Sequence, residues 1–292
     1  MPVHPLQSYF TEKNLTTFSV KEWKAIFSEQ LSGLYSTAPY SLNPEFLFRA
    51  RINFDKKKKV DFFKKTKELW SPPKNIITEQ DRCSAKGQNL LYCSTNPTTT
   101  IFEMKPPTGT EITIIRYKIL SEIGLLGAVG VKEIMKINDS YKAVFCNHFK
   151  KVPPSSEMID DILSDIFKLR AKHTKTFPLY NLTNAVSQIF MNKQKTSGKK
   201  NDHTAESLIG LVYPSVETEK ILGMNMVMNP QKVKNILIPV VAYKYRILER
   251  HDDHHYDILL THQTRAINRT GELIWGLKYG NEIEHITDLE LH

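Results

Sequence analysis

Three residues within positions 81–103 could together bind and cleave one ligand: Arg82, Tyr92 and Glu103. The arginine supplies a permanent cation with several donors for phosphate oxygens. The tyrosine supplies a flat ring with a hydroxyl, and the glutamate supplies a carboxylate that could face a sugar. Such a set suits a ligand that combines a diphosphate, a ring and a sugar, which is the outline of NAD. A loop arginine, a core tyrosine and a surface glutamate are the alternative interpretation.

The local sequence predicts which element carries each of these residues. Arg82 lies in a polar loop that contains a glycine, and residues 90–93 have the apolar character of a short buried strand that includes Tyr92. Asn96 followed by Pro97 is typical of a helix start, so we expect a helix that carries Glu103 on its first turns. A loop, a strand and a helix would therefore position the three side chains.

The composition is that of an ordinary globular protein, with 292 residues, 40% hydrophobic and 24% charged. No apolar run approaches the roughly 20 residues that a membrane helix needs, so we expect no membrane partner. The first residues lack the basic start and apolar centre of a secretory signal. Three cysteines without metal-ligand spacing fit a reducing compartment, which predicts a cytoplasmic location and no metal.

The net charge of +9 is compatible with nucleic acid, an anionic small molecule or an acidic protein as partner. Much of the excess lies in short lysine runs, which are usually solvated faces or loops. They are found at 56–59, 64–67, 193–195 and 199–200. No nucleic-acid-binding motif accompanies them, so nucleic acid is an unlikely partner.

The order of elements predicts an α+β fold, with a mixed β-sheet core and flanking helices. The pattern is interrupted, which disfavours a doubly wound parallel sheet. We expect a helical N-terminal extension at 1–45, a main domain at 46–246 with a lysine-rich surface insertion at 55–80, and a C-terminal β-hairpin extension at 247–292, packed on the same domain. Gly124, Gly127 and Gly130 do not match a dinucleotide-binding fingerprint and are interpreted as turn glycines.

Four short motifs in this order resemble the RES domain, a family named for an arginine, a glutamate and a serine. They are FRAR at 48–51, DRCSAKG at 81–87, LLYCS at 90–94 with a glutamate eleven residues past its tyrosine, and GLVYPSV at 210–216. LGMNMVMNP at 222–230 also resembles the segment that follows the family's serine. The resemblance extends over roughly 47–245. This chain is longer than compact members, and its two arginine motifs are farther apart.

The resemblance implies a fold related to the ADP-ribosyltransferases and NAD as the substrate, with no further cofactor. RES domains are known as toxins of bacterial toxin–antitoxin pairs, usually with a helix-turn-helix antitoxin. They destroy NAD by hydrolysis or phosphorolysis, and some modify a protein with ADP-ribose. A toxin or an anti-phage effector is therefore expected, with inorganic phosphate and an antitoxin protein as possible partners. The extra segments could cover the antitoxin surface or supply an antitoxin within the same chain.

The resemblance also assigns roles by motif position. Glu103 would stabilise the positive charge that develops on the ribose as nicotinamide leaves. Arg49 and Arg82 would hold the diphosphate, because arginine binds phosphate in a bidentate manner. Tyr92 would stack on nicotinamide, and Ser215 would contact a phosphate or the ribose. Ser215 is not expected to be a nucleophile, because no G-x-S-x-G pattern surrounds it.

Several alternatives remain beside this assignment. Arg49 could pair with an acidic neighbour, and Arg51 could be the arginine that faces the ligand. Tyr92 could be a core residue, and Ser215 a turn residue after Pro214. Tyr213 and Asn225 are plausible supporting residues.

Two other kinds of site are weighed against this one. The run of histidines and aspartates at 251–255 could bind zinc, but it is interpreted as an exposed polar turn without a distant third ligand. Cys83 and Cys93 lack the histidine partner that a cysteine nucleophile needs. For the whole protein, the alternatives are a protein ADP-ribosyltransferase on the same scaffold, or a basic nucleic-acid-binding or interaction protein.

Overall fold

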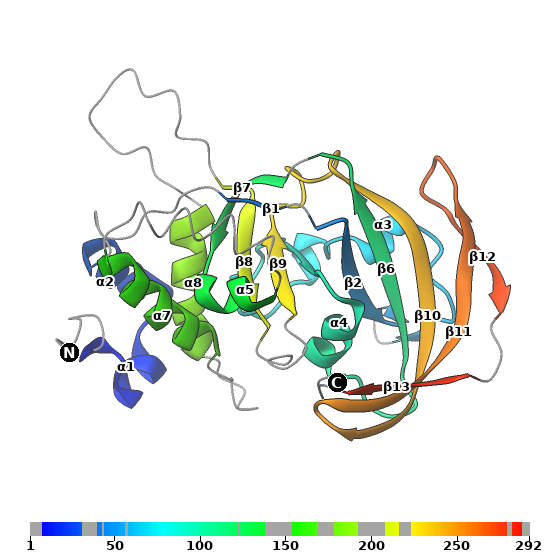
Figure 1. The fold of residues 1–292 in the computed structure, drawn as a ribbon, viewed down its shortest axis with the longest axis horizontal. Helices are drawn as coiled ribbons and strands as arrows, with labels where there is room; N and C mark the ends of the chain where they lie inside the picture. Colours follow the sequence, from blue (N-terminus) through cyan, green and yellow to red (C-terminus); the bar gives the residue numbers. More distant parts are fainter. Residues whose placement is uncertain are drawn as a thin grey trace.

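A computed structural model gives the fold shown in Figure 1. The structure describes residues 8–30, 40–42, 44–55, 58–121, 123–137, 154–168, 178–191, 208–215, 223–278 and 282–287. The lysines at 193–195 and 199–200, and those at 56 and 57, lie outside these ranges. Within the described part of the chain, no helix is both long and apolar enough to cross a membrane.

One large sheet passes through the whole molecule. Its strands follow the order β1-β7-β8-β9-β5-β2-β6-β10-β11-β12, and β13 pairs with β11. The β7–β8 pair is parallel, whereas the other pairs in the sheet are antiparallel. The bounds are β1 Tyr40–Leu42, β2 Phe46–Ile52, β5 Leu91–Ser94, β6 Glu111–Ile119, β7 Ile123–Ala128, β8 Gly210–Pro214, β9 Met224–Met228, β10 Leu237–Asp252, β11 His255–Ile267, β12 Leu273–Lys278 and β13 Ile283–Thr287. The mixed sheet with flanking helices confirms the α+β class.

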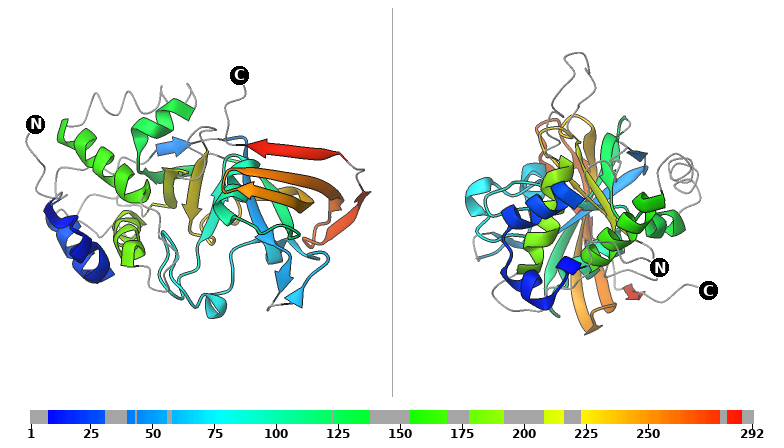
Figure 2. Two further views of the ribbon diagram at one scale, coloured as in Figure 1. Left: turned by 90° about the horizontal axis from the view of Figure 1, so that it is seen from below. Right: turned by 90° about the vertical axis from the view of Figure 1, so that its left-hand side faces the viewer.

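Helices gather at one end of the sheet, beside β7 and β8, while the long strands β10 and β11 curl at the other end (Figures 1 and 2). This group consists of α1 Glu12–Thr17, α2 Val20–Gln30, α5 Val131–Ile137, α7 Pro154–Lys168 and α8 Pro178–Met191. Their apolar faces bury Trp23, Leu163 and Val186 against Leu211 of β8. These helices and β8 therefore enclose one of the hydrophobic cores of the protein.

Within the described residues 8–30, the N-terminal extension forms the two helices α1 and α2, in agreement with the prediction of a helical segment. Ser19 and Glu22 form a reciprocal capping box before α2, with Glu22 N donating to Ser19 Oγ at 3.3 Å and Ser19 N to Glu22 Oε2 at 2.7 Å. Trp23 and Phe27 are fully buried. Tyr40–Leu42, however, forms strand β1 on the edge of the sheet and corrects the prediction of an all-helical segment.

The lysine-rich segment at 55–80 is more than a surface insertion. It contains the short hairpin β3 Phe54–Asp55 and β4 Lys58–Lys59, the helix α3 Thr66–Leu69 and a turn of 3-10 helix at Lys74–Ile76. Phe63 and Leu69 are buried in the core that covers one face of the sheet. Apolar residues spaced between the lysines thus anchor this segment, which corrects the expectation of a surface excursion.

Leu69→Ala is expected to lower the free energy of unfolding by about 2–5 kcal/mol, because it removes a fully buried leucine and leaves a cavity. Urea unfolding followed by circular dichroism measures this loss. Leu120→Ala is the matched control, because Leu120 is 56% exposed and its truncation should change stability by no more than about 0.5 kcal/mol. Equal stabilities of the two variants would contradict the packing of the segment.

The three glycines at 124–130 do not all lie in turns. Gly124 and Gly127 belong to strand β7, and only Gly130 has the positive φ, 70°, of a turn glycine. A Cβ atom on Gly127 would lie 2.7 Å from the ring of Phe190, so the close approach of α8 to the sheet requires glycine there. The prediction of turn glycines is therefore wrong for Gly124 and Gly127.

The C-terminal hairpin forms as predicted but has no boundary with the main domain. β11 and β12 pair about the turn at 268–271, where Gly271 has a φ of 77°. β10 runs without a break through position 246 and pairs with β11 along most of its length. The hairpin therefore continues the central sheet, and the boundary at 246/247 falls inside a strand.

Candidate active site

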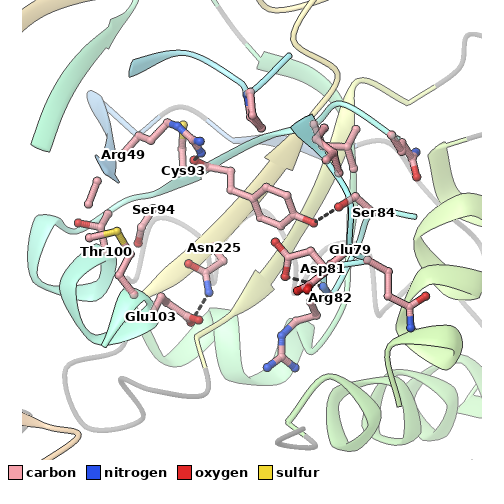
Figure 3. A pocket seen from close by; sticks show the side chains of 18 of the residues that line it. Arg49, Glu79, Asp81, Arg82, Ser84, Cys93, Ser94, Thr100, Glu103 and Asn225 are labelled. Carbon is pink, nitrogen blue, oxygen red and sulfur yellow. Dashed lines mark hydrogen bonds between the residues drawn. The ribbon is translucent and has the colours of Figure 1, made fainter. Parts of the chain in front are cut away.

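A cavity of about 690 Å³ lies where β2, β5 and the helix α4 Pro97–Met104 meet the loop at 76–90. We call it the central cavity. Four of the five predicted site residues line it: Arg49, Arg82, Tyr92 and Glu103. Figure 3 shows Arg49 and Glu103 on one side and Arg82 on another. The sequence motifs, which are up to 54 positions apart, thus converge on one space.

Glu103 is held at the end of a short helix by two hydrogen bonds. Asn96 caps the start of α4 by accepting from Thr98 N at 2.8 Å, and Pro97 follows at the first helical position, as predicted. Glu103 lies on the last turn of this eight-residue helix rather than on its first turns. A carboxylate is unfavourable at a helix C-terminus because of the helix dipole. Neighbouring donors must therefore hold the charge there.

Those donors come from strands β8 and β9. Ser215 Oγ donates to Glu103 Oε1 at 2.6 Å, and Asn225 Nδ2 donates to the same oxygen at 2.5 Å (Figure 3 marks the Asn225 bond). Ser215 directly follows the end of β8 and is only 4% exposed. It is not among the residues that line the cavity. The structure therefore places this hydroxyl behind Glu103, whereas the predicted contact of Ser215 with NAD remains a prediction.

Arg82 is buried in a loop that two helices hold in place. Thr183 Oγ1 donates to the carbonyl of Arg82 at 2.5 Å, and Asn184 Nδ2 donates to the carbonyl of Asp81 at 2.7 Å. Both residues lie on α8. The Arg82 guanidinium donates from Nη1 to the carbonyl of Phe167 at the end of α7. Only 9% of Arg82 is exposed, so the loop and the helices fix its orientation.

The charge of Arg82 is stabilised by its neighbours despite this burial. Burial alone would lower the pKa of Arg82, but the nearby Tyr213 and Glu103 raise it above its usual value. The Arg82 guanidinium carbon also lies 5.9 Å from the centre of the Tyr180 ring. Arg82 therefore places a permanent positive charge at the central cavity, which Glu103 also lines.

Tyr92 joins strand β5 to the same loop. Its hydroxyl accepts a hydrogen bond from Cys83 N at 3.2 Å and donates to Ser84 Oγ at 3.1 Å. Burial raises the pKa of Tyr92 well above its usual value, so the phenol is protonated at neutral pH. Tyr92 is half-buried and lines the cavity, and it therefore combines a structural role with an accessible ring.

Arg49, rather than Arg51, is the arginine of β2 that lines the cavity. Arg49 Nε donates to the carbonyl of Leu69 at 3.1 Å, and its Nη1 donates to the carbonyl of Tyr92 at 2.9 Å. Arg51 Nη1 donates to the carbonyl of Glu68, and its guanidinium carbon lies 5.6 Å from the centre of the Phe63 ring. Backbone carbonyls therefore orient both side chains, and only Arg49 borders the central cavity.

Sequence reasoning missed other residues of the site. Glu79 and Asp81 are two exposed acids that also line the central cavity. Thr183 and Asn184 hold the Arg82 loop from about 100 positions away. The only local sign of this role in the sequence is that Thr183 and Asn184 are polar, whereas their neighbours at 182, 185 and 186 are apolar.

The cysteines in this region are poorly suited to act as nucleophiles. Burial raises the pKa of Cys83 to about 12, and burial does the same for Cys93. Both thiols are therefore protonated at neutral pH, whereas a nucleophilic cysteine needs its thiolate.

Comparison of the chain with family models, with curated proteins and with solved structures gives no match. A functional assignment must therefore be argued from the motifs and from the geometry of the central cavity.

Proposed function

We propose that the protein consumes NAD in the cytoplasm by cleaving the bond between nicotinamide and ribose, as RES domains do. One observation carries this proposal. The carboxylate of Glu103 is fixed by Ser215 and Asn225 on the wall of a cavity that it shares with Arg49 and Arg82. The cavity volume, about 690 Å³, lies within the range of about 300–1,000 Å³ that is typical of small-molecule sites.

The chemistry needs one carboxylate and no general acid for the leaving group. The ring nitrogen of the nicotinamide is already cationic, and it takes the electron pair of the breaking bond and departs neutral. Positive charge then develops on the ribose, and Glu103 stabilises this charge more strongly in the transition state than in the ground state. Water or inorganic phosphate forms the new bond to the anomeric carbon, and water loses a proton as it does so.

The two arginines suit the diphosphate of NAD. Guanidinium groups bind phosphate oxygens through several donors in fixed geometry, which lysine cannot do. Backbone carbonyls already hold Nε and Nη1 of Arg49, so we expect a phosphate to be bound through Nη2. Arg82 would be the second contact, and the ring of Tyr92 would stack on the nicotinamide.

Ser215 is proposed to position Glu103. Ser215→Ala removes one of two hydrogen bonds to the carboxylate, and a hydrogen bond to a charged group contributes about 1.5–3 kcal/mol. Because the hydrogen bond from Asn225 remains, we expect the activation free energy to rise by an amount near the lower end of this range. This rise lowers kcat about tenfold and leaves KM unchanged. Steady-state kinetics of nicotinamide release separates the two constants. An increase of KM at constant kcat would indicate direct contact of Ser215 with NAD instead.

The resemblance to RES domains extends the proposal to biology. The activity would arrest growth, as in a toxin or an anti-phage effector, and a second protein with a helix-turn-helix domain would neutralise it. Co-expression with the neighbouring gene product tests this part, because a toxin should be tolerated only with its antitoxin.

Product analysis tests the enzymatic proposal. Purified protein is incubated with NAD in the presence and absence of inorganic phosphate, and the products are separated by chromatography. Nicotinamide together with ADP-ribose indicates hydrolysis, and nicotinamide together with phosphorylated ADP-ribose indicates phosphorolysis. A labelled protein adduct that forms faster than free ADP-ribose would identify a protein ADP-ribosyltransferase. NAD that stays intact under both conditions would refute the proposal.

A further inference from the structure

Three histidines and one aspartate lie together where β10 turns into β11. We call His251, His255, Asp257 and His285 the histidine cluster. The turn itself consists of Asp253 and His254, which are half-buried, whereas His251, Asp252 and His255 belong to the flanking strands. The prediction of an exposed polar turn at 251–255 is therefore correct only in part. The cluster, however, extends over three adjacent strands, because His285 of β13 is paired with Asp257 of β11. Figure 1 shows β13 beside the lower end of this hairpin, where β10 turns into β11.

The backbone places these side chains on one face. His255 and Asp257 are two residues apart on β11, and alternate residues of a strand share a face. The register of β10 against β11 shifts between Arg250 and Asp252, so His251 is the additional residue of a bulge. Bulges change the direction of a side chain, and this one brings His251 to the same group.

The distances within the cluster are those of potential metal ligands. His251 Nε2 lies 3.1 Å from Asp257 Oδ2, and the rings of His251 and His255 have centroids 4.4 Å apart. One ligand atom from each of His251, His255 and Asp257 lies within 4.8 Å of the other two. Ligand atoms around a tetrahedral zinc ion are about 3.3 Å apart, given metal–ligand distances of about 2.0–2.1 Å. Small side-chain rotations therefore suffice to bind an ion.

We propose that the histidine cluster binds a divalent transition-metal ion of the zinc type, with His251, His255 and Asp257 as its three protein ligands. Two imidazoles and one carboxylate form a ligand set that zinc sites use, with a fourth position left for water. His285 is a positioning residue, because its Nδ1 lies 2.7 Å from Asp257 Oδ1, the oxygen that does not face His251. Glu249 Oε1 lies 3.9 Å from His251 Nδ1, the ring nitrogen of His251 that does not face Asp257.

Two surface hydrogen bonds between histidine and aspartate are the simpler explanation of these contacts. They would account for His251 and His285, which both contact Asp257. They do not account for the position of His255, whose ring lies against the ring of His251.

The bound ion would connect β10 to β11 at the end of the hairpin, and the hairpin in turn supports α4. Lys105 follows α4 and pairs with Asp253 of the turn, with Nζ and Oδ2 2.8 Å apart. The rings of Phe102 and Tyr256 have centroids 5.7 Å apart, which packs the same helix on β11. The ion is therefore expected to act on stability, and this inference does not depend on the proposed NAD chemistry.

Zinc titration of the full chain tests the proposal. The protein is first treated with a chelator and then titrated with Zn²⁺ in competition with a coloured indicator, and thermal unfolding is recorded with and without Zn²⁺. We expect one ion per chain and a higher melting temperature in its presence. His255→Ala should lose this binding, as should Asp257→Asn, which keeps the shape of the side chain.

His285→Ala should weaken the binding about tenfold, as is typical when a supporting partner of a metal ligand is removed. His254→Ala is the matched control and should bind as the wild type does, because the His254 ring lies near Phe102, with ring centroids 6.1 Å apart, rather than in the cluster. Absence of Zn²⁺ binding by the wild type, or undiminished binding by both His255→Ala and Asp257→Asn, would overturn the proposal.

Discussion

Glu103→Gln is expected to lower kcat for NAD cleavage by about 10²–10³-fold, the loss typical of removing one group that stabilises transition-state charge. Glutamine has the same shape, and its amide oxygen can still accept from Ser215 and Asn225. It carries no negative charge for the ribose cation. Because the arginines are unchanged, KM for NAD should change little. Nicotinamide release under saturating NAD measures the effect.

Glu29→Gln is the matched control for this variant. Glu29 is an exposed residue of α2, so its replacement should leave both kcat and the melting temperature unchanged. A Glu103→Gln protein that folds normally and retains more than about a tenth of the wild-type kcat would exclude the carboxylate from the chemical step.

Arg82→Lys is expected to lower kcat/KM by about 10- to 150-fold. A hydrogen bond to a charged group contributes about 1.5–3 kcal/mol, and lysine keeps the charge of Arg82 but not its planar fork of donors. The loss should come largely from a higher KM, because the diphosphate is bound in both the ground state and the transition state. Initial rates over a range of NAD concentrations give both constants.

Arg51→Lys provides the comparison. Arg51 lies on the same sheet as Arg49 but does not line the central cavity, so this variant should bind and cleave NAD as the wild type does. Thermal unfolding of both variants identifies any loss of folding, because Arg82 also contacts the carbonyl of Phe167. A larger catalytic loss in Arg51→Lys than in Arg82→Lys would contradict the assignment of the arginines.

Local signals in the sequence predicted the elements that carry the site. Asn96 and Pro97 start a helix because one caps its free N–H groups and the other has the required φ. Pro214 ends the apolar strand β8, and this places Ser215 at the strand terminus. These features act within a few residues, so a single sequence was enough to find them.

Contacts between distant segments could not be predicted in this way. A side chain at position 127 would clash with Phe190 of α8, and that helix begins about 50 positions later. The Arg82 loop is held by Thr183 and Asn184, and neither spacing nor periodicity connects them to it. For the same reason, His285 gave no sign that it would be paired with Asp257.

The structure of Glu103→Gln with NAD bound is the most direct test of the central claim. Our account predicts the dinucleotide in the central cavity, with its diphosphate on Arg49 and Arg82. The anomeric carbon of the nicotinamide ribose should lie within about 3.5 Å of the side chain at position 103. NAD bound outside this cavity, or bound with its diphosphate away from both arginines, would contradict it.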